Sequence, residues 1–274
     1  MFAPNSGQRI DFDLAYKTAG ERDLHLDIFR PAPALNRGQG LLLVHGGAWR
    51  SGSKAHFYAL ANRLARRGYT VFLPEYRLAP EAPYPAGMRD VADALAWAQG
   101  NAKHYGLKPS RIAIGGASSG GQMAALLAYR GTDAYGAGKA VPNALVDLDG
   151  VLDMTTPFAL GFENAAGPAS PFAQWLGGSF EQVPQRWREA SAATYVGAAS
   201  PPTLVIASSA PRFTAGREAV LAALKAKGIR TDSYTFARSP HDLWLFEPYL
   251  GVAVERIDRF LRAVAADEAR KGRK

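Results

Sequence analysis

The fold is decided by the stretch RIAIGGASSGGQMAALLAYR, residues 111–130. It begins with an apolar run, passes through small residues that include two adjacent serines, and continues as a run that favours a helix. This order predicts a strand, a sharp turn and a helix. The turn, residues 116–120, has the pattern G-x-S-x-G, which between a strand and a helix is typical of an exposed nucleophilic serine.

Either serine of this turn could be the nucleophile. Ser118 has glycine two residues away on both sides, at Gly116 and Gly120, whereas Ser119 has Ala117 on one side. A nucleophile on a strained turn needs small flanking residues, so we favour Ser118. The N–H of Ser119 is then expected at the helix N-terminus, where it can stabilise an oxyanion. In the alternative interpretation both hydroxyls only cap the helix.

Apolar runs and helical patterns alternate on both sides of this stretch. The alternation predicts an α/β fold with a mostly parallel, doubly wound sheet, in a single domain over residues 1–274. Strands are expected at 24–29, 41–45, 70–76, 111–116, 145–152, 203–208 and 231–236. Helices are expected at 57–68, 87–106, 120–131 and 215–228, followed by a final amphipathic helix with Val254, Ile257, Leu261 and Val264 on one stripe.

One segment, residues 155–196, interrupts the alternation. It is rich in Gly, Pro, Phe and Trp, and it is too long for an ordinary connection between two strands. Ligand sites in open sheets lie beyond the carboxyl ends of the strands, so we expect this insertion to form a cap that helps to shape a pocket. The alternative is an insertion that only packs on itself.

Composition narrows the class of protein. The 274 residues are 47% hydrophobic and 20% charged, which is typical of a globular chain, and no apolar run approaches the length of a membrane span. The net charge of +8 is dispersed along the chain, which argues against nucleic-acid binding. There is no cysteine, no metal-ligand spacing and no phosphate-binding glycine fingerprint, so we expect no metal or cofactor. The first residues lack the pattern of a signal peptide, which favours a cytoplasmic location unless the sequence is a processed or truncated form.

A second motif, VHGGAWRSGSK at residues 44–54, follows the expected strand 41–45. Glycines at a strand end allow backbone N–H groups to face a cavity. We expect the N–H groups of Gly47 and Ala48 to join that of Ser119 in an oxyanion hole. His45 in this loop could be a second base, but we favour a structural role in which its imidazole holds the loop by hydrogen bonds.

A third motif, ARSPHDLWLF at residues 237–246, supplies a base. A serine hydroxyl needs an adjacent imidazole to take its proton. Of the five histidines, only His241 lies on a loop after a late strand, and it follows Ser118 in the chain. We therefore expect His241 to be the general base.

Four separately placed motifs carry a resemblance to a known family. HGGAW, EYRLAPEAPYPAGMRDVADALAW, GASSGG and HDLWLF resemble the esterase/lipase branch of the α/β-hydrolase superfamily, which includes hormone-sensitive-lipase-like carboxylesterases and BD-FAE-type esterases. The resemblance covers roughly residues 20–262. It implies a serine esterase that forms an acyl-enzyme with a small-molecule ester, and it does not indicate the oligomeric state. The segments WLGGSFEQVPQRWREASAATYV and SSAPRFTAGRE are similar to a subgroup associated with acetyl or feruloyl groups on plant polysaccharides.

The third member of the triad departs from the family pattern. The family usually places an aspartate just after the strand corresponding to 203–208, but the matching position near Ala210 has no carboxylate. Asp149 is expected inside its strand. The remaining candidates, in order of preference, are Asp153, Glu218 and Asp242.

Two other functions stay open. Kynurenine-formamidase-type enzymes also have an HGG-x-W loop, so an amidase or peptidase of the same fold is an alternative. A chain without a triad acid could also be a non-catalytic binding protein on a hydrolase scaffold.

Overall fold

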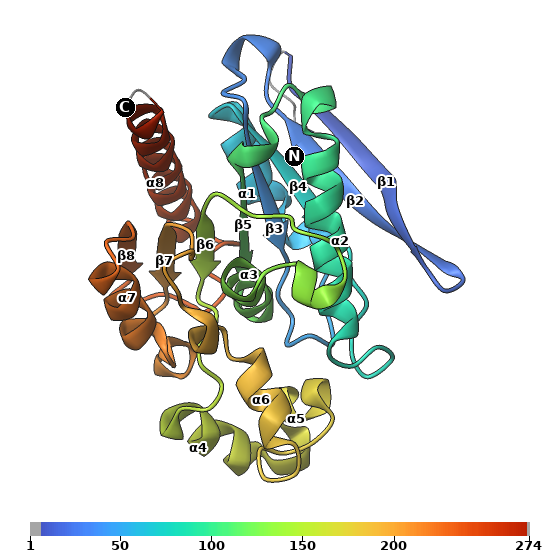
Figure 1. Cartoon of the computed structure of the whole chain (residues 1–274), viewed down its shortest axis with the longest axis vertical. Helices are drawn as coiled ribbons and strands as arrows, with labels where there is room; N and C mark the ends of the chain where they lie inside the picture. Colours follow the sequence, from blue (N-terminus) through green and yellow to red (C-terminus); the bar gives the residue numbers. More distant parts are fainter. Residues whose placement is uncertain (1–6, 273–274) are drawn as a thin grey trace.

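The computed structural model describes residues 7–272 and contains one eight-stranded sheet (Figure 1). The strand order is β1-β2-β4-β3-β5-β6-β7-β8; β1 and β2 pair antiparallel, β2 and β4 pair antiparallel, and all other pairs are parallel. This confirms the predicted mostly parallel α/β sheet. The strands are β1 (Arg9–Ala19), β2 (Arg22–Arg30), β3 (Gln39–Val44), β4 (Tyr69–Pro74), β5 (Ile112–Ala117), β6 (Leu145–Leu148), β7 (Thr203–Ala207) and β8 (Thr231–Thr235).

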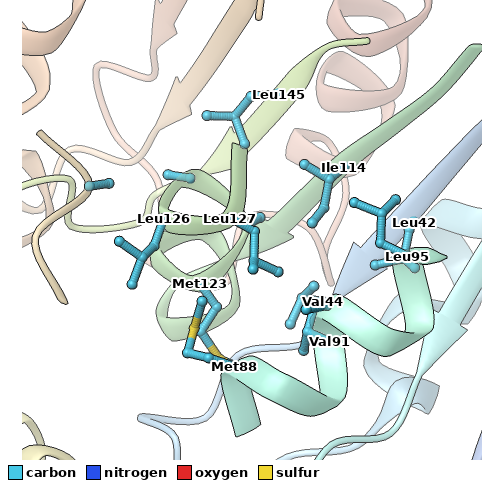
Figure 2. Close-up of a cluster of buried hydrophobic side chains, with 14 of the residues drawn as sticks. Leu42, Val44, Met88, Val91, Leu95, Ile114, Met123, Leu126, Leu127 and Leu145 are labelled. Carbon is cyan, nitrogen blue, oxygen red and sulfur yellow. The ribbon is translucent and has the colours of Figure 1, made fainter. Parts of the chain in front are cut away.

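Helices cover both faces of the sheet. On β3, Leu42 and Val44 point into one core cluster, while Leu41 and Leu43 point into the other, because successive side chains of a strand alternate between faces. The first cluster is closed by α2 (Ala86–Gly100), α3 (Ser119–Arg130) and α7 (Arg217–Ala226), and the second by α1 (Tyr58–Arg66) and α8 (Tyr249–Lys271). Figure 2 shows the first cluster, with residues such as Met88 and Met123 packed between α2, α3 and the strands.

The insertion at residues 155–196 forms three short α-helices that lie together at the lower end of Figure 1. They are α4 (Pro157–Ala166), α5 (Pro171–Leu176) and α6 (Pro184–Ala190), and each begins with proline at its first position. Thr156 and Ser170 cap α4 and α5, since their hydroxyl oxygens accept hydrogen bonds from the N–H groups of Ala159 and Ala173. Trp175 and Trp187 are buried and belong to the first core cluster, so the insertion is packed against the sheet domain.

Two strands differ from the prediction. The edge strand β1 was not expected, and β6 ends at Leu148, four residues before the predicted end at 152. None of the helices within residues 7–272 combines the length and apolar character needed to cross a membrane. The prediction that there is no signal peptide concerns the first residues of the sequence. Of these, residues 1–6 lie outside the described residues.

Candidate active site

Ser118 lies on the turn between β5 and α3, as the motif predicts. Its backbone is strained, with φ 54° and ψ −125°, a conformation that a non-glycine residue adopts only when its surroundings enforce it. Two glycines leave room for this turn. A Cβ atom on Gly116 would lie 2.3 Å from the carbonyl oxygen of Gly120, and a Cβ atom on Gly120 would lie 2.0 Å from that of Val44. The strand-turn-helix geometry therefore requires both glycines of the motif.

The register of the central strands places Ser118 beside Asp149. Ala117 at the end of β5 pairs with Leu148 at the end of β6, so the next residues, Ser118 and Asp149, leave the sheet together. The N–H of Ser118 donates to the carbonyl oxygen of Leu148 at 2.8 Å, and the N–H of Asp149 donates to that of Ile206 in β7 at 2.9 Å. Backbone hydrogen bonds between neighbouring strands thus fix the positions of both residues.

Asp149 is the carboxylate that contacts His241. Its Oδ2 atom lies 2.6 Å from Nδ1 of His241, and the carboxylate is almost completely buried. A carboxylate oxygen can only accept this hydrogen bond, so in the neutral imidazole the proton is on Nδ1 and Nε2 has a free lone pair; His241 itself lines the cavity. Such an imidazole can accept a proton from a hydroxyl, and the carboxylate can stabilise the imidazolium that results.

This contact corrects the prediction of Asp153. The Oδ1 atom of Asp153 accepts hydrogen bonds from the N–H and the hydroxyl of Thr155, at 2.8 and 2.7 Å, and so serves the turn that leads into α4. Glu218 is exposed and forms an ion pair with Arg217 at 3.0 Å. Asp242 lines the same cavity as His241, but it is Asp149 that bonds to the imidazole.

Sequence reasoning missed Asp149 because it treated residues 145–152 as one strand. The strand ends at Leu148, and Asp149 has a positive φ of 58°. Asp149 is followed by Gly150, and an Asp-Gly dipeptide is a turn signal that could have ended the strand at this point.

Two aromatic rings hold the imidazole of His241 from the sides. The ring of Phe213 stacks on it with centroids 3.5 Å apart and an interplanar angle of 11°. Trp244 contacts it edge-on, at 5.4 Å and 85°. Together with Asp149, these rings fix both the position and the rotation of the imidazole.

The predicted oxyanion donors lie around the same cavity as Ser118. Gly47, Ala48 and Ser119 all line it, and Gly47 and Ala48 have positive φ values of 128° and 56°. A Cβ atom on Gly47 would lie 2.1 Å from the carbonyl oxygen of Ser51, so this turn requires glycine. Over residues 7–272, the N–H groups of Gly47, Ala48 and Ser119 have no acceptor within the protein. They are therefore available to a negatively charged oxygen in the cavity.

His45 has the structural position that we expected. It is buried, does not line the cavity, and its Nδ1–H donates to the carbonyl oxygen of Gly46 at 2.9 Å. Its ring stacks on Tyr76 at 4.4 Å, and the hydroxyl of Tyr76 donates to the carbonyl oxygen of His45 at 2.9 Å. Burial lowers the pKa of His45 to about 4, so the imidazole is neutral at physiological pH.

The cavity has a volume of about 490 Å³ and takes its walls from both the sheet and the insertion. Pro171 and Phe172 of α5 line it together with Ser118. Within the described part of the chain, no group of three or more His, Cys, Asp and Glu side chains is arranged to hold a metal ion. The remaining wall is formed by Gly46, Trp49, Arg50, Ser51, His56, Gln122, Val151, Arg212, Phe213, Asp242, Trp244 and Leu245.

The insertion is joined to the oxyanion loop through Trp49. The indole of Trp49 stacks on Trp175 of α5, with centroids 4.6 Å apart and an interplanar angle of 11°. Its Nε1–H donates to Oε1 of Gln122 at 3.1 Å, and Nε2 of Gln122 donates to the carbonyl oxygen of Ala190 at 2.7 Å. The loop that carries the oxyanion donors is therefore packed against the insertion and hydrogen-bonded to it through α3.

Comparisons with known proteins agree with this geometry. The sequence model of the family described as BD-FAE matches residues 26–218. Among curated proteins, esterase LipQ of Mycobacterium tuberculosis is 30% identical over 242 residues, which are 84% of this chain and 56% of the relative. The chain spans about half, or less, of the length of the curated relatives that it matches.

Solved structures share the fold at low sequence identity. A butyrate-bound esterase from Thermogutta terrifontis superposes with a TM-score of 0.73 at 21% identity, over 94% of this chain and 95% of that one. A bacterial heroin esterase superposes with a TM-score of 0.79 at 23% identity, over 94% of this chain and 85% of that one. The fold of the described chain is therefore the α/β-hydrolase fold, as its motifs predict.

Proposed function

Because the chain belongs to the BD-FAE family, we propose that it is a carboxylic-ester hydrolase that acts on small acyl esters through an acyl-enzyme on Ser118. One observation carries the proposal. Nδ1 of His241 lies 2.6 Å from the buried carboxylate of Asp149, and His241 lines the cavity that also contains Ser118 and three free N–H donors. The relatives named as esterases support the same reaction class.

The proposed reaction begins at the hydroxyl of Ser118. Its Oγ attacks the ester carbonyl carbon while Nε2 of His241 takes the hydroxyl proton, and Asp149 stabilises the imidazolium that forms. The carbonyl oxygen becomes an oxyanion that accepts hydrogen bonds from the N–H groups of Gly47, Ala48 and Ser119. The C–O bond to the alcohol then breaks, and the imidazolium returns its proton to the leaving oxygen.

Water completes the cycle. His241 takes a proton from a water molecule, whose oxygen attacks the acyl carbon and forms a second oxyanion in the same donor set. When this intermediate collapses, the bond to Ser118 breaks, the carboxylic acid leaves and His241 returns the proton to the serine oxygen. Ser118, His241 and the oxyanion donors therefore act in both halves of the reaction.

The cavity supports a small acyl group. Trp49 and Phe172 contact each other edge-on at 5.2 Å on its wall, to which the insertion contributes Pro171 and Phe172. We propose that residues 155–196 act as a cap that limits the size of the acyl chain. The more specific expectation, acetyl or feruloyl groups on plant polysaccharide fragments, stays a prediction.

The test is the turnover of p-nitrophenyl acetate by wild type, Ser118→Ala and Ser119→Ala. We expect Ser118→Ala to lose at least about a thousandfold in kcat. Ser119 contributes through its backbone N–H, so Ser119→Ala, the matched control, should stay within about threefold of wild type. Full activity of Ser118→Ala would contradict the proposal.

A second experiment separates this proposal from its alternatives. A fluorophosphonate probe should label wild type and fail to label Ser118→Ala, whereas a non-catalytic binding protein would not be labelled at all. Hydrolysis of N-formylkynurenine in preference to acetylated xylo-oligosaccharides and p-nitrophenyl acetate would indicate an amidase instead of an esterase.

A further inference from the structure

A continuous row of flat side chains leads from the catalytic imidazole to the surface of α4. Phe213 stacks on His241 at 3.5 Å, and the guanidinium of Arg212 lies 5.9 Å from the centroid of Phe213. The same guanidinium lies 6.0 Å from the centroid of Phe162, whose ring packs edge-on against Phe158 at 5.2 Å. Arg212 and Phe213 line the cavity, and the two α4 rings lie just beyond it.

The position of the row identifies the part of the substrate that it faces. In the proposed reaction His241 returns its proton to the oxygen of the leaving alcohol, so that oxygen must lie next to the imidazole. The oxyanion donors hold the carbonyl oxygen on the other side of Ser118. Side chains that continue outward from His241 therefore contact the alcohol and not the acyl group.

The charges along the row favour an uncharged ring over an anion. Nη2 of Arg212 donates to Oε1 of Glu163 at 2.7 Å, and Glu163 is buried and also accepts a hydrogen bond from Ser170 at 2.6 Å. The guanidinium is thus neutralised by its own carboxylate and contacts the rings of both Phe213 and Phe162. A planar cation and aromatic rings are surfaces on which an aromatic ring stacks.

The outer end of the row is open to solvent. The side chains of Phe158 and Phe162 are 45% and 42% exposed, and because they are four residues apart they occupy one face of α4. Two exposed phenyl rings side by side, continuous with the wall of the cavity, form an apolar surface that a substrate ring could cover.

We propose that Phe213, Arg212 and Phe162 form a leaving-group subsite for aryl alcohols of two rings, such as biphenylyl esters. The first ring packs against Phe213 and Arg212 where these side chains line the cavity, and the second reaches Phe162. This inference rests on the proposed esterase function and adds the class of alcohol.

The test compares two acetate esters of similar reactivity, phenyl acetate and 4-biphenylyl acetate. The measured quantity is the ratio of their kcat/KM values, in which the common acyl group cancels. Loss of one aromatic contact to the second ring should lower this ratio about fivefold in Phe162→Ala. Phe162→Leu, which keeps an apolar side chain without a ring, should lower it in the same direction.

Phe12→Ala is the matched control. Phe12 is 54% exposed, lies on the edge strand β1 and does not line the cavity, so its removal should leave the ratio unchanged. An unchanged ratio in Phe162→Ala would overturn the subsite. So would a loss confined to acetylated xylo-oligosaccharides, because the row would then bind a sugar.

Failure of the subsite and failure of the esterase function give different results. If phenyl acetate is hydrolysed through Ser118 and the ratio does not respond to Phe162, the function stands and the subsite is wrong. If wild type hydrolyses neither ester, or Ser118→Ala hydrolyses both at the wild-type rate, the function itself is wrong.

Discussion

Ser208 donates two hydrogen bonds to Asp149. Its N–H reaches Oδ1 at 2.9 Å and its hydroxyl reaches Oδ2 at 2.5 Å, the same oxygen that contacts His241. Ser208 directly follows β7, and Asp149 directly follows β6. A residue at the end of one strand thus orients the acid at the end of its neighbour, and this acid in turn orients the imidazole.

Removal of the Ser208 hydroxyl should therefore weaken catalysis without weakening substrate binding. A hydrogen bond to a charged group contributes about 1.5–3 kcal/mol, so we expect Ser208→Ala to lower kcat by roughly ten- to a hundredfold. KM for p-nitrophenyl acetate should change little, since the hydroxyl bonds to the carboxylate. Ser209→Ala is the control, because the exposed Ser209 bonds only to the backbone of Ser239. Equal kcat values for the two variants would contradict the positioning role.

The identity of the acid can be tested by a pair of isosteric substitutions. Asp149→Asn should lower kcat by on the order of 10⁴, because an amide at this position favours the wrong tautomer of His241. Asp153→Asn should stay within about threefold of wild type, since Asp153 bonds to Thr155. Steady-state kinetics with p-nitrophenyl acetate measure both variants. The reverse order of effects would restore Asp153 as the acid.

Gln122 should be important for stability. It is buried, accepts from the indole N–H of Trp49 and donates to the carbonyl oxygen of Ala190. Gln122→Leu would leave a buried donor and a buried acceptor unpaired, which should lower the free energy of unfolding by about 2–5 kcal/mol. Urea unfolding followed by tryptophan fluorescence measures the loss. The exposed Gln174→Leu should cost less than about 1 kcal/mol, and a similar cost for both variants would contradict this account.

His45 should make the stability of the fold depend on pH. Burial lowers its pKa to about 4, below the value of about 6.5 in an unfolded chain, so the unfolded state binds more protons between these values. Stability contributed by the neutral imidazole is therefore complete above about pH 6.5 and is lost as the pH falls towards 4, by about 3 kcal/mol.

The measurement is urea unfolding at several pH values between 4 and 7.5. His45→Gln cannot titrate, so its free energy of unfolding should fall less steeply with decreasing pH than that of wild type. The exposed His104 provides the control, because removing it as His104→Gln should preserve the wild-type slope. Parallel curves for wild type and His45→Gln would show that the imidazole does not titrate differently on unfolding.

The sequence predicted the central part of the fold because that part is buried. Strands β3 to β7 are covered on both faces and appear as continuous apolar runs, and the helices between them repeat apolar residues at helical spacing. Strand β1 was missed for the opposite reason. It lies at the sheet edge, and none of its residues between Arg9 and Ala19 is fully buried, so it has no continuous apolar run. Its signal is the alternation of apolar residues at 10, 12, 14 and 16, which is the period of a strand and was overlooked.

The parts of the candidate site that are formed by one continuous motif could be predicted from the sequence. The turn around Ser118 and the loop at Gly47 each consist of consecutive residues. The small residues in them indicate, from the sequence alone, where backbone segments pack closely together. The contact between His241 and Asp149 joins residues 92 positions apart. It depends on where β6 ends, and an error of a few residues at a strand end is sufficient to place a different carboxylate at the site.

The stack of Trp49 on Trp175 has a consequence for how substrates enter. A lid that swings away must leave the catalytic groups undisturbed, but here α5 packs directly on the loop that carries the N–H groups of Gly47 and Ala48. Lifting α5 would separate the two indoles and release the loop that they hold. We therefore expect α5 to stay in place during turnover, so that the size of the existing cavity selects between substrates.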